Sequence, residues 1–184
     1  MNSISLLVLL LVNFTAIGLL PILFFRRDGS FNLRWIATGA PFFVIPAVLI
    51  LGWFGVLEAA PLGAGAAIAT VLSAVSIGLI AMTVGTHRIP LALWHQDNDA
   101  PAEIVTWGPY ARVRHPFYTS FLLAFAAAAL AFPHLLTAAC LIYGAIALTI
   151  TAAREEKRLS ASEFGEEYRQ YMSVSGRFFP RVTS

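Results

Sequence analysis

Residues 116–153 decide the fold, and they read PFYTSFLLAFAAAALAFPHLLTAACLIYGAIALTITAA. The run contains no formally charged residue. It is too long for one membrane-crossing helix, which needs about 20 apolar residues, and short for two. Pro133 and His134 lie near its middle, and proline breaks the hydrogen-bond ladder of a helix. We therefore predict a tight helical hairpin with both arms in the membrane.

Three further apolar runs precede this hairpin, at residues 4–25, 35–57 and 62–84. The chain is 58% hydrophobic and 12% charged, whereas a soluble domain is about 45–50% apolar and about 25% charged. We predict an all-α integral membrane protein with five transmembrane helices and a cytoplasmic C-terminal helix. Residues 1–85 would form a three-span N-terminal part, and residues 86–184 would form the functional part.

The basic residues predict the orientation of these spans. All 12 Lys and Arg residues lie in three segments, at residues 26–34, 87–115 and 154–184. Five spans place these segments on one side, which the positive-inside rule assigns to the cytoplasm, with the N-terminus outside. The abundance of alanine favours a bacterial inner membrane. The net charge of +2 argues against nucleic acid as a partner.

The first cluster of polar residues is GPYARVRHPFY at residues 108–118. Pro116 suits the first turn of a helix, which would place His115 beside free backbone amides at its start. Such a helix start binds anions, and Arg114 lies next to it. The alternative is that these basic and aromatic residues merely anchor a span at the membrane surface.

The second cluster is REEKRL at residues 154–159, followed by EFGEEYRQY at residues 163–171. Glu155 and Glu156 would oppose the helix dipole if the fifth span ended at Ala153. Either the helix continues into the cytoplasm, with these carboxylates paired along it, or one of them contacts a ligand.

Other functions find little support. The first three apolar runs contain no ionisable residue, which counts against a pump or an ion-coupled transporter. His87, His95 and His115 lack the spacing of metal ligands, so we predict no metal site. Cys140 lies in an apolar run without an activating neighbour, which favours inert packing.

The two clusters, in this order and spacing, resemble the isoprenylcysteine carboxyl methyltransferase family and its bacterial and phospholipid-methyltransferase relatives. The resemblance covers roughly residues 102–182 and rests on Gly-Pro-Tyr, Arg-His-Pro-x-Tyr, Glu-Glu-x-x-Leu and Phe-Gly-x-x-Tyr-x-x-Tyr. It implies S-adenosylmethionine as cofactor and a hydrophobic small molecule or lipid as substrate. The cofactor-binding residues that we expect are Ala102, Glu103, Ile104, Val105, Tyr110, Arg114, His115, Pro116, Phe117, Tyr118 and Glu156.

The chain departs from the prenylcysteine enzymes of eukaryotes at two positions. Ala102 stands where they have histidine, and Ala152 stands where they have an arginine implicated in substrate handling. Ser120, where glycine is common, is a milder difference. The cofactor site is therefore better supported than prenylcysteine as substrate.

The reaction that the resemblance implies is direct displacement, in which the protein mainly orients the acceptor and the methyl group. A carboxylate acceptor needs no base. An amine, as in a phospholipid N-methyltransferase, must lose a proton, and Glu155 and Tyr110 are then the candidate catalytic residues. The rival interpretations are an NADPH-dependent enzyme resembling sterol reductases and a membrane scaffold without activity. The sequence does not predict an oligomeric state.

Overall fold

A computed structural model describes residues 4–18, 30–31, 33–59, 65–86 and 104–181. Within these ranges the chain is helical and forms no β-strand. The predicted all-α fold is confirmed. The helices are α1 (Ile4–Gly18), α2 (Leu33–Thr38), α3 (Pro41–Trp53), α4 (Gly65–Thr86), the short 3₁₀ helix η3 (Gly108–Ala111), α5 (Pro116–Ala131), α6 (Leu135–Ser160) and α7 (Gly165–Val174).

Three helical segments are long and apolar enough to cross a membrane, namely Ile36–Trp53, Gly65–Thr86 and Leu135–Ser160. Helices α1 and α5 are apolar but shorter, with 15 and 16 residues. The chain is therefore a membrane protein, while the count of five spans stays a prediction. Part of the first predicted span, residues 19–25, lies outside the described residues.

The predicted second span contains a bend that the apolar pattern did not indicate. Helix α2 ends at Thr38, and a turn at Gly39 and Ala40 leads into α3. Pro41 occupies the first turn of α3, where its missing N–H removes no helical hydrogen bond.

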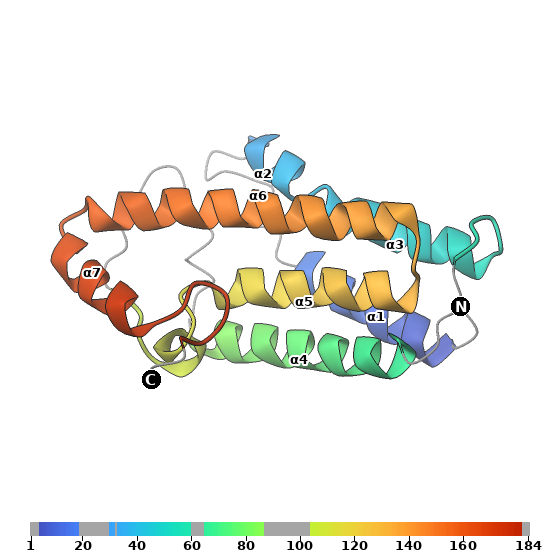
Figure 1. Ribbon diagram of the computed structural model, residues 1–184, viewed down its shortest axis with the longest axis horizontal. Helices are drawn as coiled ribbons and strands as arrows, with labels where there is room; N and C mark the ends of the chain where they lie inside the picture. The colour runs from blue at the N-terminus through green and yellow to red at the C-terminus, as the bar shows by residue number, and fades with distance from the viewer. Residues whose placement is uncertain (1–3, 19–29, 32, 60–64, 87–103, 182–184) are drawn as a thin grey trace.

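The turn predicted at Pro133 and His134 is confirmed, since α5 ends at Ala131 and α6 begins at Leu135. His134 caps α6: its Nδ1 accepts from the Leu136 amide at 3.1 Å, and the His134 amide donates to Thr137 Oγ1 at 3.3 Å. Helices α5 and α6 run side by side (Figure 1). Helix α6 is much the longer and continues through Glu155 and Glu156. The helix therefore does not end at Ala153, which is one of the two alternatives given above.

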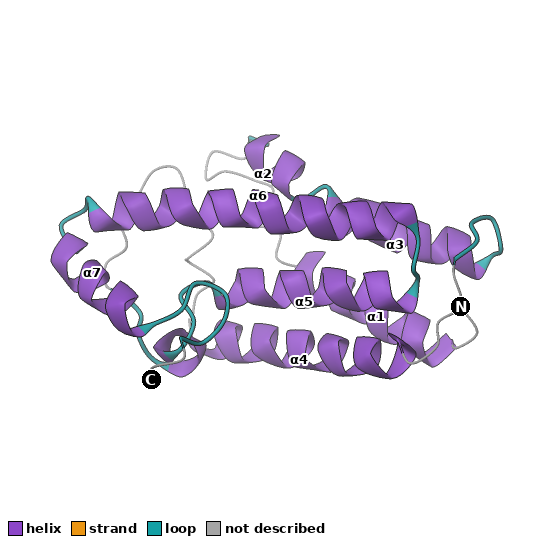
Figure 2. Ribbon diagram, viewed as in Figure 1, coloured by secondary structure: helices purple, strands orange, loops and turns teal. Residues whose placement is uncertain are grey.

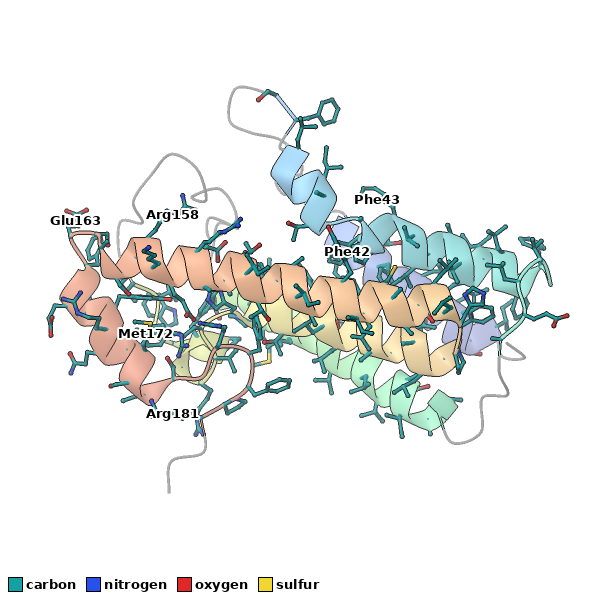
Figure 3. All side chains as sticks on the ribbon, turned by 45° about the horizontal axis from the view of Figure 1, so that its top comes forward. Phe42, Phe43, Arg158, Glu163, Met172 and Arg181 are labelled. Carbon is teal, nitrogen blue, oxygen red and sulfur yellow. The ribbon has the colours of Figure 1, made fainter. Side chains whose placement is uncertain are left out.

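Helix α5 lies between α4 and α6 and supplies the centre of the core (Figure 1). The Phe42 ring packs edge-on against Phe121 and at a tilt against Phe125, each at 4.9 Å between centroids. Neighbouring Phe43 is 59% exposed and points away from the bundle (Figure 3). Helices with apolar side chains on both their inner and outer faces are typical of membrane spans.

A buried polar contact joins three helices. Ser76 Oγ of α4 lies 3.0 Å from Asn13 Oδ1 of α1 and 2.8 Å from the Ser120 carbonyl oxygen of α5. One hydroxyl carries one proton, so the amide of Asn13 turned round would donate to Ser76 while Ser76 donates to Ser120.

We expect Ser76→Ala to lower the free energy of unfolding by about 0.5–2 kcal/mol, because it removes this interhelical contact. Ser73→Ala is the matched control on the same helix. The Ser73 hydroxyl is equally buried and has no hydrogen-bond partner among the described residues, so its removal should be neutral or stabilising. Unfolding in detergent measures both, and equal losses in the two variants would contradict the contact.

Candidate functional site

The site forms where the C-terminal tail returns to the start of α5. After α7, residues 175–178 run alongside residues 112–115 and pair with them as a parallel bridge between Val113 and Gly176. The Arg114 amide donates to the Gly176 carbonyl at 2.8 Å, and the His115 amide donates to the Arg177 carbonyl at 3.1 Å. Figure 2 shows these loops together at one end of the helical bundle. Charged side chains gather at the same end, where Arg158, Glu163 and Arg181 are labelled in Figure 3.

Glu156 is the centre of an ion cluster with Arg114, His115 and Arg177. Helix α6 carries its carboxylate to the start of α5, where the side chain is only 7% exposed. Arg114 Nε donates to its Oε1 at 2.9 Å. Arg177 donates through Nε to both oxygens at 3.1 Å and through Nη2 to Oε2 at 2.6 Å. A buried carboxylate is stable when it is paired and hydrogen-bonded in this way.

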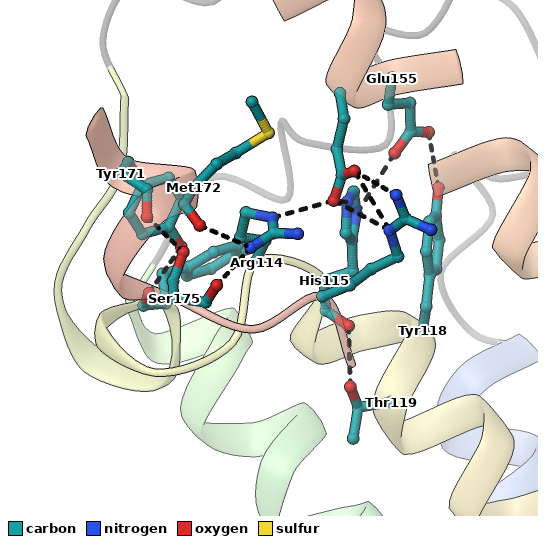
Figure 4. Close-up of polar contacts among 11 residues, drawn as sticks. Arg114, His115, Tyr118, Thr119, Glu155, Tyr171, Met172 and Ser175 are labelled. Atoms are coloured by element: carbon teal, nitrogen blue, oxygen red, sulfur yellow. Dashed lines mark hydrogen bonds and ion pairs between the residues drawn. The ribbon is translucent and has the colours of Figure 1, made fainter. Parts of the chain in front are cut away.

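Arg114 is fixed from a second direction. Its Nη1 donates to the backbone carbonyls of Met172, in the last turn of α7, and of Ser175, directly after it (Figure 4). Unpaired carbonyls at the end of a helix favour a cation. Arg114 therefore connects α7 to α6 and has little freedom to move.

His115, Tyr118 and Glu155 form a second group beside this cluster. The rings of His115 and Tyr118 stack with centroids 5.2 Å apart and an interplanar angle of 1°. Tyr118 donates to Glu155 Oε1 at 2.7 Å, and His115 Nδ1 lies 3.5 Å from Glu155 Oε2 (Figure 4).

The imidazole of His115 is buried, and one of its two ring nitrogens makes no hydrogen bond to the described residues. Burial lowers its pKa, so the ring is neutral near pH 7 even though Glu156 alone would favour the charged form. Its Nε2 lies 3.3 Å from Glu156 Oε1 but makes no hydrogen bond within the described part of the chain. A buried nitrogen of this kind is rare in native proteins and is often found at functional sites.

A comparison with protein-family models matches residues 62–167 to the phospholipid methyltransferase family. The chain belongs to the phospholipid methyltransferase family. This confirms the resemblance found in the sequence and identifies the molecule as a membrane methyltransferase. Neither the curated proteins nor the solved structures contain a match. The family match extends from the segment before α4 into α7, so the tail that carries Arg177 lies beyond it.

Two residues expected to bind the cofactor of this methyltransferase, Ala102 and Glu103, lie outside the described residues. Ile104 and Val105 are half-buried before η3. Pro116 and Phe117 are buried in the first turn of α5, where Phe117 joins the hydrophobic core. Arg114, His115, Tyr118 and Glu156 converge at the cluster.

Tyr110 lies in η3 close to α7, where the Tyr171 hydroxyl donates to its carbonyl oxygen at 2.6 Å. Burial raises the pKa of Tyr110 well above its usual range, and the charge of Glu155 adds to the effect. A phenol that resists ionisation is a poor base near neutral pH. Tyr110 is therefore poorly suited to abstract a proton near neutral pH.

Sequence reasoning missed Arg177. It lies in Gly176-Arg177-Phe178-Phe179, a segment without periodicity that looks like a polar tail. Its partner Glu156 is 21 positions away. The signal that the sequence offers is the glutamate pair itself, because carboxylates carried into a buried site need cationic partners from elsewhere in the chain.

Proposed function

We propose that the protein transfers a methyl group from S-adenosylmethionine to a hydrophobic or lipid-like acceptor at the cytoplasmic face of the membrane. The convergence of His115 and Tyr118 from one arm of the hairpin with Glu155 and Glu156 from the other supports this best. A scaffold gives no reason for such groups to meet at one end of an apolar bundle.

The residues present suit this cofactor, which carries a cationic sulfonium, an amino acid group and hydroxyls. The carboxylates of Glu155 and Glu156 face cations and donors, and the unsatisfied Nε2 of His115 offers a further polar contact. We propose that Arg114, His115, Tyr118 and Glu156 hold the cofactor, together with the segment at Ile104 and Val105. When bound, the cofactor supplies an activated methyl group.

The protein's own task is then to orient the acceptor and exclude water, from which most of the rate acceleration follows. All 12 basic residues lie in segments assigned to the cytoplasmic side. The cofactor would enter from that side. A lipid acceptor would enter sideways between helices whose outer faces are apolar.

An amine acceptor would lose its proton to the Glu155 carboxylate, whose position the Tyr118 hydroxyl fixes at 2.7 Å. The neutral nitrogen could then accept the activated methyl group that the cofactor would supply. A carboxylate acceptor needs no such transfer. The family match favours the amine of a phospholipid headgroup as a candidate beside an isoprenylcysteine-type carboxylate.

We expect Glu155→Gln to lower kcat for an amine acceptor about 10²- to 10⁴-fold, because a base is lost. Tyr118→Phe should cause a smaller loss, because the base remains but is held less firmly. Glu155→Gln should not greatly affect a carboxylate acceptor, whereas Tyr118→Phe should slow transfer to it as well, because Tyr118 is proposed to hold the cofactor. Steady-state rates with both acceptor classes measure this, and equal losses with the two classes would contradict the role of Glu155.

The test of the function is transfer of labelled methyl from S-adenosylmethionine by protein in detergent, with membrane lipid extract as acceptor and products separated by chromatography. The proposal predicts label in a lipid-soluble product. A folded protein that transfers no label, or that oxidises NADPH with a sterol instead, would contradict it.

A further inference from the structure

The Arg177 side chain is held at one edge and open at the other. Its Nε and Nη2 bind Glu156 side-on, at distances of 2.6–3.1 Å. This leaves the outer edge, made of Nη1 and the second N–H of Nη2, without a hydrogen-bond partner in the described residues. Such an edge is a planar pair of donors that matches a carboxylate or phosphate.

The two arginines of the cluster differ in how they are used. Arg114 donates hydrogen bonds to Glu156 and to two carbonyls at the end of α7, and its side chain is 10% exposed. Among the residues that the structure describes, the Arg177 guanidinium donates only to Glu156, and its side chain is 36% exposed. The solvent-accessible donors of the cluster therefore belong to Arg177.

Arg177 is also positioned from its backbone. Its carbonyl accepts from the His115 amide at 3.1 Å, which sets the tail beside the start of α5. The next residue, Phe178, packs its ring edge-on against His115 at 6.1 Å. The guanidinium is thus fixed at both ends, and a preorganised donor loses little entropy when it binds a ligand.

We propose that Arg177 forms an oxyanion subsite of the methyltransferase site, in which its outer edge binds a carboxylate or phosphate oxygen pair of a ligand. Glu156 acts as the positioning residue that orients this guanidinium. The inference rests on the proposed function. Two sources share the required chemistry: the amino acid carboxylate of the cofactor and the phosphate of a phospholipid headgroup.

The experiment compares Arg177→Gln with Arg181→Gln by calorimetry in detergent. Arg181 lies in the same tail, is exposed and donates to the Ser173 carbonyl at 2.5 Å, away from the cluster. The probes are S-adenosylhomocysteine, its decarboxylated analogue, and glycerophosphoethanolamine. The loss of a charged hydrogen bond corresponds to about a 10- to 100-fold weaker affinity.

If the cofactor carboxylate is the ligand, Arg177→Gln should weaken the binding of S-adenosylhomocysteine by this factor and leave the affinity for the decarboxylated analogue unchanged. If the phosphate is the ligand, Arg177→Gln should weaken the binding of glycerophosphoethanolamine only. Equal weakening of all three probes, or of none, would overturn the subsite, since the arginine would then act only on Glu156 or not at all. A wild type that binds no S-adenosylhomocysteine contradicts the proposed function instead, and the phosphate probe then decides the subsite alone.

Discussion

Glu156→Gln is expected to abolish binding of S-adenosylhomocysteine and to lower the free energy of unfolding by about 3–5 kcal/mol, the usual loss when one partner of a buried ion pair is removed. The carboxylate accepts from Arg114 and Arg177 and is almost fully buried. A neutral amide leaves both guanidinium groups without a counter-charge and places its own N–H₂ against one of them.

The matched control for this variant is Glu166→Gln. Glu166 pairs with Arg169 at 2.7 Å, but its side chain is 91% exposed, and exposed pairs contribute little. Unfolding by denaturant in detergent and calorimetry below the transition measure the two effects separately. A Glu156→Gln protein as stable as the wild type would contradict the ion cluster. If the folded variant bound S-adenosylhomocysteine with full affinity, Glu156 would not be part of the cofactor site.

Gly176→Ala is expected to produce the second large effect. An added Cβ would lie 1.7 Å from the Phe179 carbonyl oxygen and 2.9 Å from its carbonyl carbon, and these backbone atoms cannot move without unfolding the tail turn. The bridge to Val113 would break and Arg177 would leave Glu156. We expect a loss of about 2–3 kcal/mol in stability and at least tenfold weaker binding of S-adenosylhomocysteine.

Gly85→Ala is the control for Gly176→Ala. Gly85 lies in α4, and an added Cβ meets no atom within 4 Å. Alanine is favoured over glycine in a helix, so this variant should be unchanged or slightly more stable. If Gly176→Ala behaves like Gly85→Ala, the tail does not hold the site together as described.

The apolar pattern predicted the helices well where hydrophobicity alone specifies them. The run at residues 62–84 became α4 (Gly65–Thr86), and the break at Pro133 separates α5 from α6. The bend at Gly39 and Ala40 was missed because the apolar pattern continues through it, although Gly39 and the position before Pro41 both disfavour a continuous helix.

The site was predictable only where its residues lie in compact motifs. His115, Tyr118 and Glu156 were expected from the resemblance, and they lie together. The role of Arg177 was not predicted, since its position follows from the pairing of residues 175–178 with residues 112–115. Contacts of such long sequence separation arise from tertiary structure and leave no periodic pattern in the chain. The burial of Tyr110, which counts against this residue as a base, likewise follows from the fold and cannot be predicted from the sequence.

The most direct test of the central claim is calorimetric titration of S-adenosylhomocysteine into the purified protein in detergent. A membrane methyltransferase with its cofactor site at the Glu156 cluster should bind with an affinity in roughly the micromolar range, about −8 kcal/mol, and Glu166→Gln should bind equally well. No binding by a protein shown to be folded would contradict both the cofactor and the site.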